Sequence, residues 1–270
     1  NSAVRGIPKD FEGDYRIFDG DFNGTVTVDI GADEYVAQVL FVDGQSGDDA
    51  NNGQSWGTAK QTIQAAIDDA DSGDQIWVRA DTYVLSPLTV HSDEGIEVNE
   101  VVFIYGGFNG TESLRSERNW QDNVTIIEGD EWAKHCFYIT ADGILDGFTI
   151  RGGNATGISS PDDRGGGVHV AAASPKLANC TFTYNEAGFG GALNIENNAS
   201  PTLLNCTFIS NKAFVSTFTA NQGGAVYISN STPSFVNCLF YENHAHQGAA
   251  LYIVHPASHP VITNCTFAGN

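Results

Sequence analysis

The chain has 270 residues, and 33 acidic against 12 basic side chains give it a formal net charge of −21. Phosphate binding needs a basic surface, so this charge excludes nucleic acid as a partner and argues against polyanionic substrates. No segment of the sequence has the length of a membrane-spanning helix, so no membrane span is expected.

Residues 1–35 form an acidic N-terminal segment, which we interpret as the end of a preceding module or as a cap between subunits. Asp19, Asp21 and Asn23 stand at alternate positions before Gly24, as in calcium-binding loops, although no Glu stands at the twelfth position. Two interpretations stay open: these three residues bind calcium, or they form an acidic turn that binds no ion. No other cofactor is expected.

The main domain is expected to span 36–270, and its first part, 41–85, contains the single convincing helix of the sequence. Within 55–71 apolar residues recur at helical spacing, and Thr58 with Gln61 has the spacing of a capping box. A short amphipathic helix at this place is suited to cover the open end of a stack of strands.

Strands are predicted where apolar and polar residues alternate, or where apolar runs lie between turn-forming residues. Before the regular repeats, these runs are 75–85, 101–108 and 123–130. The run at 145–153, LDGFTIRGG, already has the spacing of the later repeats, with Gly147 in place of their asparagine. We therefore assign 86–164 to irregular coils of the same fold and 165–270 to regular coils.

From residue 165 onward the sequence repeats one pattern four times, at 165–185, 190–211, 223–243 and 248–270. Each copy begins with glycine, continues with alternating apolar and polar residues, and then contains Asn-Cys-Thr-Phe or a close variant. Alternation with period two predicts strands, and fixed motifs with variable filler predict stacked units. Strands met once per period lie above one another only in a solenoid. The predicted fold is all-β: a right-handed parallel β-helix with one short N-terminal capping helix.

Equivalent positions of the repeats should form columns along the solenoid axis. We expect an inner phenylalanine column, an inner column of buried thiols, and an asparagine column at one corner with its side chains turned inward. The members of these columns are Phe182, Phe208, Phe240 and Phe267; Cys180, Cys206, Cys238 and Cys265; and Asn179, Asn205, Asn237 and Asn264. In-register neighbours on parallel strands are poorly placed for disulfides, so the thiols should be free, and Cys136 should also be buried.

Two further groups of residues are candidate sites. Four Asn-x-Ser/Thr asparagines outside the columns are candidate glycosylation sites in a suitable host: Asn109, Asn123, Asn154 and Asn198. Four histidines lie in two turns of the last coils, and they either form a zinc or copper site or are ordinary loop residues. These are His244, His246, His255 and His259.

No matched catalytic constellation is found in the sequence, so the chain is not expected to be an enzyme. Hydrolysis of a glycosidic bond needs two carboxylates one or two rungs apart. Asp162 and Asp163 are the only close acidic pair of the coil region, and their loop composition favours a solvated turn neutralised by Arg164. Three glutamates, Glu186, Glu196 and Glu242, do not share a repeat position.

The pairing of Gly-Gly-Ala-Val at 223–226 with Phe-Tyr-Glu-Asn at 240–243 resembles the repeat of the chlamydial polymorphic outer membrane proteins. Residues 36–270 resemble large bacterial and archaeal surface proteins with right-handed β-helix repeats. Residues 10–35 resemble the closing segment of the same families, like the end of a choice-of-anchor domain. The resemblance implies the β-helix fold and an adhesin-like or structural role.

We therefore expect a secreted or cell-surface structural protein, extracellular in location, that is one unit of a tandem array or head-to-tail fibre. Its expected partners are further copies of the chain, glycans or a cell surface. The alternative is a carbohydrate-active β-helix protein: a polysaccharide lyase, a glycoside hydrolase or a glycan-binding module. An enzyme should gather charged residues from two or three adjacent rungs at one cleft, beside exposed aromatic side chains.

Overall fold

The computed structural model describes residues 17–18, 27–28, 37–130, 132–157, 162–215 and 221–270. The chain divides into two compact units, Asn1–Gln38 and Val39–Asn270. In the first unit, β1 (Ile17–Phe18) and β2 (Thr27–Val28) pair as antiparallel strands. None of the helices in the described ranges is long and apolar enough to cross a membrane.

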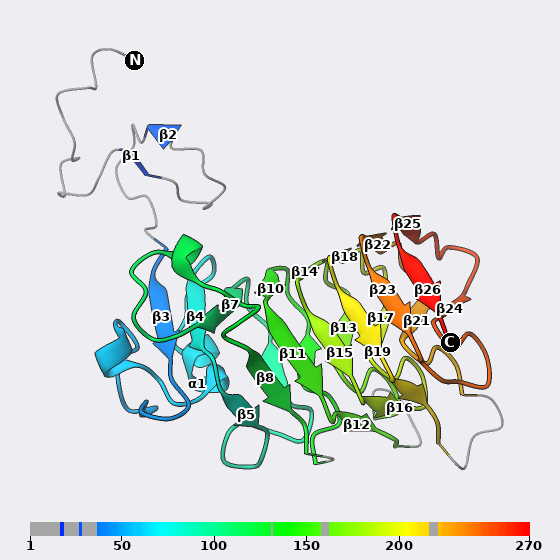
Figure 1. Cartoon of the computed structure of the whole chain (residues 1–270), viewed down its shortest axis with the longest axis horizontal. Coiled ribbons are helices and arrows are strands. Elements are labelled where there is room, and N and C mark those ends of the chain that lie inside the picture. Colours follow the sequence, from blue (N-terminus) through cyan, green and yellow to red (C-terminus); the bar gives the residue numbers. More distant parts are fainter. Residues whose placement is uncertain (1–16, 19–26, 29–36, 131, 158–161, 216–220) are drawn as a thin grey trace. The chain divides into compact units, whose positions relative to one another are not determined.

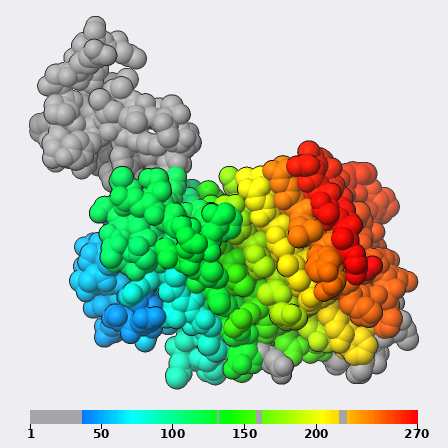
Figure 2. Space-filling view, viewed as in Figure 1, coloured from blue at the N-terminus to red at the C-terminus, as the bar shows by residue number. Residues whose placement is uncertain are grey.

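The second unit winds as a parallel β-helix (Figure 1), which confirms the predicted all-β solenoid. Every pair of strands that the structure describes in this unit is parallel. The space-filling view shows the coils as consecutive bands of colour along this unit, in the order of the sequence (Figure 2).

Four sheets run along the unit. The eight-stranded sheet contains, in spatial order, β25 (Val261–Thr263), β22 (Ser234–Val236), β18 (Thr202–Leu204), β14 (Lys176–Ala178), β10 (Ile144–Asp146), β7 (Phe103–Phe108), β4 (Gln75–Arg79) and β3 (Val39–Val42). The seven-stranded sheet contains β26 (Thr266–Ala268), β23 (Leu239–Tyr241), β19 (Thr207–Ile209), β15 (Thr181–Thr183), β11 (Phe148–Arg151), β8 (Thr125–Glu128) and β5 (Thr82–Val84). The six-stranded sheet contains β24 (Leu251–Val254), β21 (Val226–Ser229), β17 (Leu193–Glu196), β13 (Val168–Ala171), β9 (Phe137–Ile139) and β6 (Ile96–Val98). A short sheet contains β12 (Asn154–Ala155), β16 (Glu186–Ala187) and β20 (Lys212–Ala213).

The inner columns consist of identical residues stacked rung over rung. Phe182, Phe208 and Phe240 are fully buried, and their ring centroids lie 4.7 and 4.8 Å apart with nearly parallel planes. Phe267 continues the stack at 4.7 Å and is 45% exposed. The cysteines of the repeats are free, and each thiol donates to a backbone carbonyl, as Cys206 does to Leu177 O at 3.4 Å. Cys136 is free and buried as well.

The asparagine column lies at the outer corner between two sheets, and this differs from the expected inward orientation. Asn179, Asn205, Asn237 and Asn264 all have φ between 52° and 55°, a left-handed conformation that asparagine tolerates. Their amides bond to one another along the corner, and the last three are exposed. The asparagines that do face inward come from the Phe-x-x-Asn part of each repeat: Asn185, Asn211, Asn243 and Asn270.

The capping helix is shorter than the sequence predicts. A 3-10 turn, η2 (Trp56–Thr58), precedes α1 (Ile63–Asp68), and the N-cap is Thr62, whose hydroxyl accepts from Ala65 N at 3.2 Å. The capping box at Thr58 and Gln61 was wrong because Lys60 bonds to the backbone of β3, which keeps the chain extended there. The apolar stripe of α1 is buried and the helix packs against β3, β4 and β6, so helical periodicity identified its buried face.

Candidate functional site

An open groove of about 650 Å³ lies beside the turns that follow β8, β11 and β15. We call it the acidic groove and define it by the residues that line it: Glu128, Asp130, Arg151, Gly152, Gly153, Asn154, Thr156, Tyr184 and Glu186. Its size is in the range of small-molecule and sugar sites.

Parallel stacking brings the charged side chains of the acidic groove together. Glu128 and Arg151 are register partners on β8 and β11, and their side chains form an ion pair. Glu186 lies in β16, one rung further, and Lys212 Nζ approaches its carboxylate at 3.7 Å. Asp130 forms no ion pair with any side chain in the described part of the chain. Charged groups from three adjacent rungs therefore meet at one groove.

Backbone conformation shapes the acidic groove. Tyr184 follows β15 with φ of 54°, and its side chain is 71% exposed. Gly152 has φ of 70°, and a Cβ there would lie 2.2 Å from Glu128 Oε1, so glycine makes room for the carboxylate. The result is an exposed aromatic ring beside carboxylates, which is an arrangement that can hold the apolar face and the hydroxyls of a sugar.

A second concentration of polar side chains lies on the six-stranded sheet, on the face opposite to the core. Register partners on successive strands place one residue of each strand in a line, which we call the outer column: Glu97, Tyr138, His169, Asn194, Tyr227 and Tyr252. Each of these residues stands between two inward apolar residues, and that position in the alternating pattern is the sequence signal for the column.

Arg164, in the loop before β13, forms ion pairs at this face of the sheet. Arg164 donates from Nη1 to Glu196 Oε2 at 2.6 Å and from Nε to Asp163 Oδ1 at 3.3 Å. Asp163 is only 5% exposed, and Asp162 instead contacts Lys134 Nζ at 3.0 Å. Arg164 does pair with Asp163, as expected, but the expectation that this aspartate is solvated was wrong, because Asp163 is buried and Arg164 also reaches a glutamate on the next strand.

Two histidine–glutamate pairs stand side by side on the same face. His169 Nε2 lies 3.3 Å from Glu196 Oε1, and His135 Nε2 lies 3.3 Å from Glu94 Oε2. The two imidazole rings meet edge to face with centroids 5.1 Å apart. His135 Nδ1 donates to Gly165 O at 2.9 Å.

These contacts shift the ionisation of both carboxyls. Burial alone would raise the pKa of Glu196, but the hydrogen bond from His169 and the charge of Arg164 lower that pKa to about 2. The approach of His135, aided by the hydrogen bond from Lys134, lowers the pKa of Glu94 to about 2. Burial lowers the pKa of His169, so this imidazole is neutral at pH 7.

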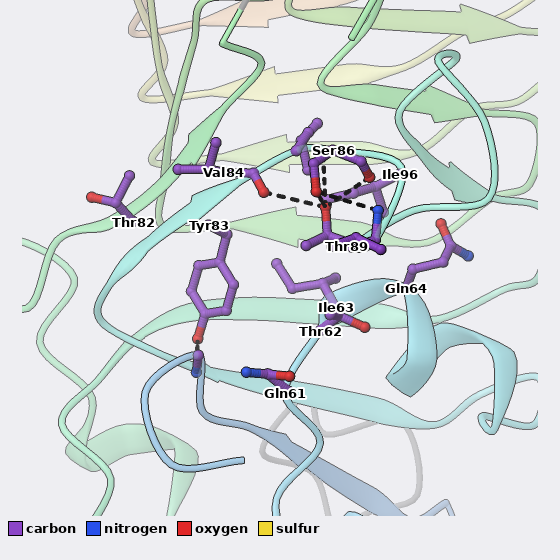
Figure 3. A pocket seen from close by; sticks show the side chains of 13 residues that line it. Gln61, Thr62, Ile63, Gln64, Thr82, Tyr83, Val84, Ser86, Thr89 and Ile96 are labelled. Carbon is purple, nitrogen blue, oxygen red and sulfur yellow. Dashed lines mark hydrogen bonds between the residues drawn. The ribbon is translucent and has the colours of Figure 1, made fainter. Parts of the chain in front are cut away.

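A smaller pocket of about 330 Å³ lies between α1 and β5 (Figure 3), and Ile63, Leu85 and Ile96 are among the residues that line it. Several of its polar groups are already in use. Tyr83 OH donates to Arg79 O at 3.0 Å, and Thr89 bonds within its own turn. This pocket therefore offers less chemistry than the acidic groove.

The residues predicted as sites are distributed over the molecule. Asn109 and Asn198 are exposed, Asn123 and Asn154 are partly buried, and Asn154 also lines the acidic groove. The candidate calcium ligands Asp19, Asp21 and Asn23 lie outside the described residues. Among the residues that are described, no group of three or more His, Cys, Asp or Glu side chains could hold a metal ion, so the four C-terminal histidines do not converge.

Residues 88–270 match the protein family described as the right-handed beta helix region. The chain belongs to this family. Its handedness agrees with the fold predicted from the repeats. No curated protein matches the sequence significantly.

Several solved structures are similar to this β-helix. A putative glycosyl hydrolase from Parabacteroides merdae is 13% identical over 76% of this chain and 86% of its own, with a TM-score of 0.44. The pectin methylesterase of Aspergillus niger is 12% identical over 88% of both chains, with a TM-score of 0.39. A pectate lyase is 10% identical over 82% of this chain and 79% of its own, with a TM-score of 0.31.

These structures correct the prediction that the chain is not an enzyme. A glycosyl hydrolase, a pectin methylesterase and a pectate lyase are among them, so a fold of this kind is no ground for expecting that the chain is not an enzyme. At such low identity the likeness concerns the fold alone, and any activity has to be argued from the residues of this chain.

Proposed function

We propose that this β-helix protein is carbohydrate-active, and that the acidic groove binds a glycan and hydrolyses it. The observation that carries the proposal is the meeting of Glu128, Asp130, Arg151 and Glu186 from adjacent rungs beside the exposed ring of Tyr184. Sugar rings pack their apolar faces on aromatic side chains and bond through their hydroxyls to carboxylates.

The proposed reaction is glycoside hydrolysis, with Asp130 and Glu186 as the acid and base. Asp130 and Glu186 lie two rungs apart, and two rungs of about 4.8 Å give a backbone spacing close to the upper end of the range of inverting glycosidases, about 6.5–9.5 Å. Glu128 is held by Arg151 and would orient the substrate. Arg151 is the only basic side chain among the groove-lining residues, and its ion pair disfavours it as the base of a lyase.

The charge of the acidic groove favours neutral glycans. Three carboxylates face one guanidinium, and the whole chain carries −21, so a polyuronate would be repelled. Because polysaccharides of this kind occur outside cells, the proposal includes an extracellular or cell-surface location. Fractionation of the source cells with an antibody against the chain would test that part.

A polysaccharide panel tests the function. We expect binding and slow cleavage of at least one neutral glycan and none of polygalacturonate. Tyr184→Ala should weaken binding about ten-fold, or about 1.4 kcal/mol, in calorimetry. Tyr241→Ala is the matched control, since Tyr241 is also exposed on the seven-stranded sheet but does not line the groove. Binding of no glycan, or equal losses in both variants, would refute the proposal.

A structural role is the second candidate, and a different observation favours it. Among the described residues, β24, β25 and β26 have a neighbouring strand on one side only, and they expose Ile253, Val261, Ile262 and Phe267. Such strands can pair with a further coil of the same kind, in the same chain or in another copy, as a surface array or fibre requires.

A further inference from the structure

His169 and Asn194 have hydrogen-bonding capacity that the rest of the described chain does not use. His169 is 1% exposed and Asn194 is fully buried. His169 Nδ1 and both polar atoms of the Asn194 amide have no hydrogen-bond partner among the described residues. The two residues are register partners on β13 and β17, so their side chains lie side by side on the outer face.

The tautomer of His169 follows from its contact with Glu196. Because Glu196 Oε1 is an ionised acceptor, Nε2 carries the proton and Nδ1 is left with a free lone pair. The Asn194 amide lies beside Glu196 and helps to lower the pKa of that carboxyl. Neither its Nδ2 nor its Oδ1 forms a hydrogen bond with a described residue. A free acceptor on His169 therefore lies next to a free donor and acceptor on Asn194.

The surroundings of the pair are aromatic and contain more carboxylates than cations. Tyr138 meets the His169 ring edge to face at 5.1 Å, and Tyr227 follows Asn194 in the outer column. Arg164, whose guanidinium lies 5.7 Å from the Tyr227 ring, pairs with two carboxylates, those of Asp163 and Glu196. This excess of negative charge disfavours an anion as the ligand.

We propose that His169 and Asn194 form a second ligand site, which binds one hydroxyl group of a neutral sugar, with His169 Nδ1 accepting and Asn194 Nδ2 donating. The hydroxyl donates its proton to Nδ1 in a hydrogen bond, and no covalent bond changes. Tyr138, which borders the pair and is partly exposed, turns aside as the sugar enters, while Glu196 keeps its contact with His169 Nε2.

The proposal explains why unpartnered polar groups are kept inside the protein. A buried amide without partners destabilises the free fold, and such groups are rare in native proteins, where functional sites are among the places that retain them. The site is on a different sheet from the acidic groove and does not depend on the function proposed for it.

Nitrogen NMR of the histidine rings tests the site directly. In the whole chain, His169 should show the neutral Nε2–H tautomer. Titration with glucose, galactose, mannose and N-acetylglucosamine should shift its Nδ1 resonance saturably for at least one sugar. The shift should persist in Tyr184→Ala, which separates this site from the groove. No saturable shift with any sugar, or a shift lost in Tyr184→Ala, would overturn the proposal.

Replacement of the amide by an apolar group of similar size gives a second readout. Asn194→Leu should weaken the sugar-dependent shift at least about ten-fold. It should also raise Tm by about 2 °C or more, because it removes a buried amide without partners. Ser229→Ala, on the same sheet, should change neither. A lower Tm for Asn194→Leu, or an unchanged sugar shift, would show that Asn194 has a structural role and that the proposal is wrong.

Discussion

Glu196 connects the ionic contacts of the outer face to the stability of the fold. In the folded chain its pKa is about 2, below the ordinary value of 4.5, because the contacts with His169 and Arg164 outweigh its burial. A carboxyl whose pKa falls on folding stabilises the protein above its unfolded pKa, and that contribution disappears as the pH falls through the folded pKa. The window for Glu196 therefore lies between about pH 4.5 and pH 2.

Glu196→Gln should lower the free energy of unfolding at neutral pH by about 1 to 3 kcal/mol, since it leaves Arg164 and His169 without their charged partner. The difference from the wild type should shrink below about pH 4.5 and vanish near pH 2. Urea unfolding over this pH range measures it. Glu100→Gln, at an exposed glutamate, should leave stability unchanged. A difference for Glu196→Gln that stays constant with pH would contradict the assignment.

At the scale of the repeat, the phenylalanine column supplies much of the packing between coils. Phe208 is fully buried, with one parallel ring on each side at 4.7 and 4.8 Å. Phe267 occupies the same repeat position but has a ring on one side only among the described residues, and it is 45% exposed. The effect of the same substitution on stability can therefore be compared at a fully buried and at a partly exposed position of one column.

Phe208→Ala should destabilise the fold by about 3 to 5 kcal/mol, through lost apolar burial and the cavity between coils. Phe267→Ala should cost less than half of that, because much of its ring already contacts water. Thermal and urea unfolding of both variants measure the difference. Equal losses of stability in the two variants would show that the contribution of a ring does not depend on its burial. They would contradict the phenylalanine column as a source of stability.

Stacked elements were predictable from sequence where identical residues repeat, and harder to predict elsewhere. The phenylalanine and cysteine columns follow directly from recurring Asn-Cys-Thr-Phe. The outer column contains different residue types, so in the sequence its members can be recognised only by their position between two apolar residues. The acidic groove joins Glu128, Arg151 and Glu186 from different coils with unequal insertions between them, and linear spacing does not reveal it. The predicted start of the capping helix was wrong because the backbone hydrogen bonds of Lys60 to β3 override local helix propensity.

At the scale of the whole molecule, the exposed coil edge and the net charge act in opposite directions. Within the part of the chain that the structure describes, β24, β25 and β26 pair on one side only, and they carry Ile253 and Ile262 at 46% and 43% exposure. An unpaired apolar edge favours pairing with another chain, while a charge of −21 repels a second copy at long range. At 0.1 M salt the repulsion between charges more than about 10 Å apart is largely screened, whereas apolar contact is left intact.

Self-association of this 270-residue chain should therefore increase with both concentration and salt. Light scattering should show masses above the monomer, rising as sodium chloride is added. The double variant Ile253→Lys and Ile262→Lys should stay monomeric, because charges on the edge oppose pairing. Leu114→Lys with Val124→Lys adds the same charge at exposed positions away from this edge and should associate like the wild type. A wild type that is monomeric at every concentration and salt level, or equal association of the two double variants, would exclude the edge as an interface.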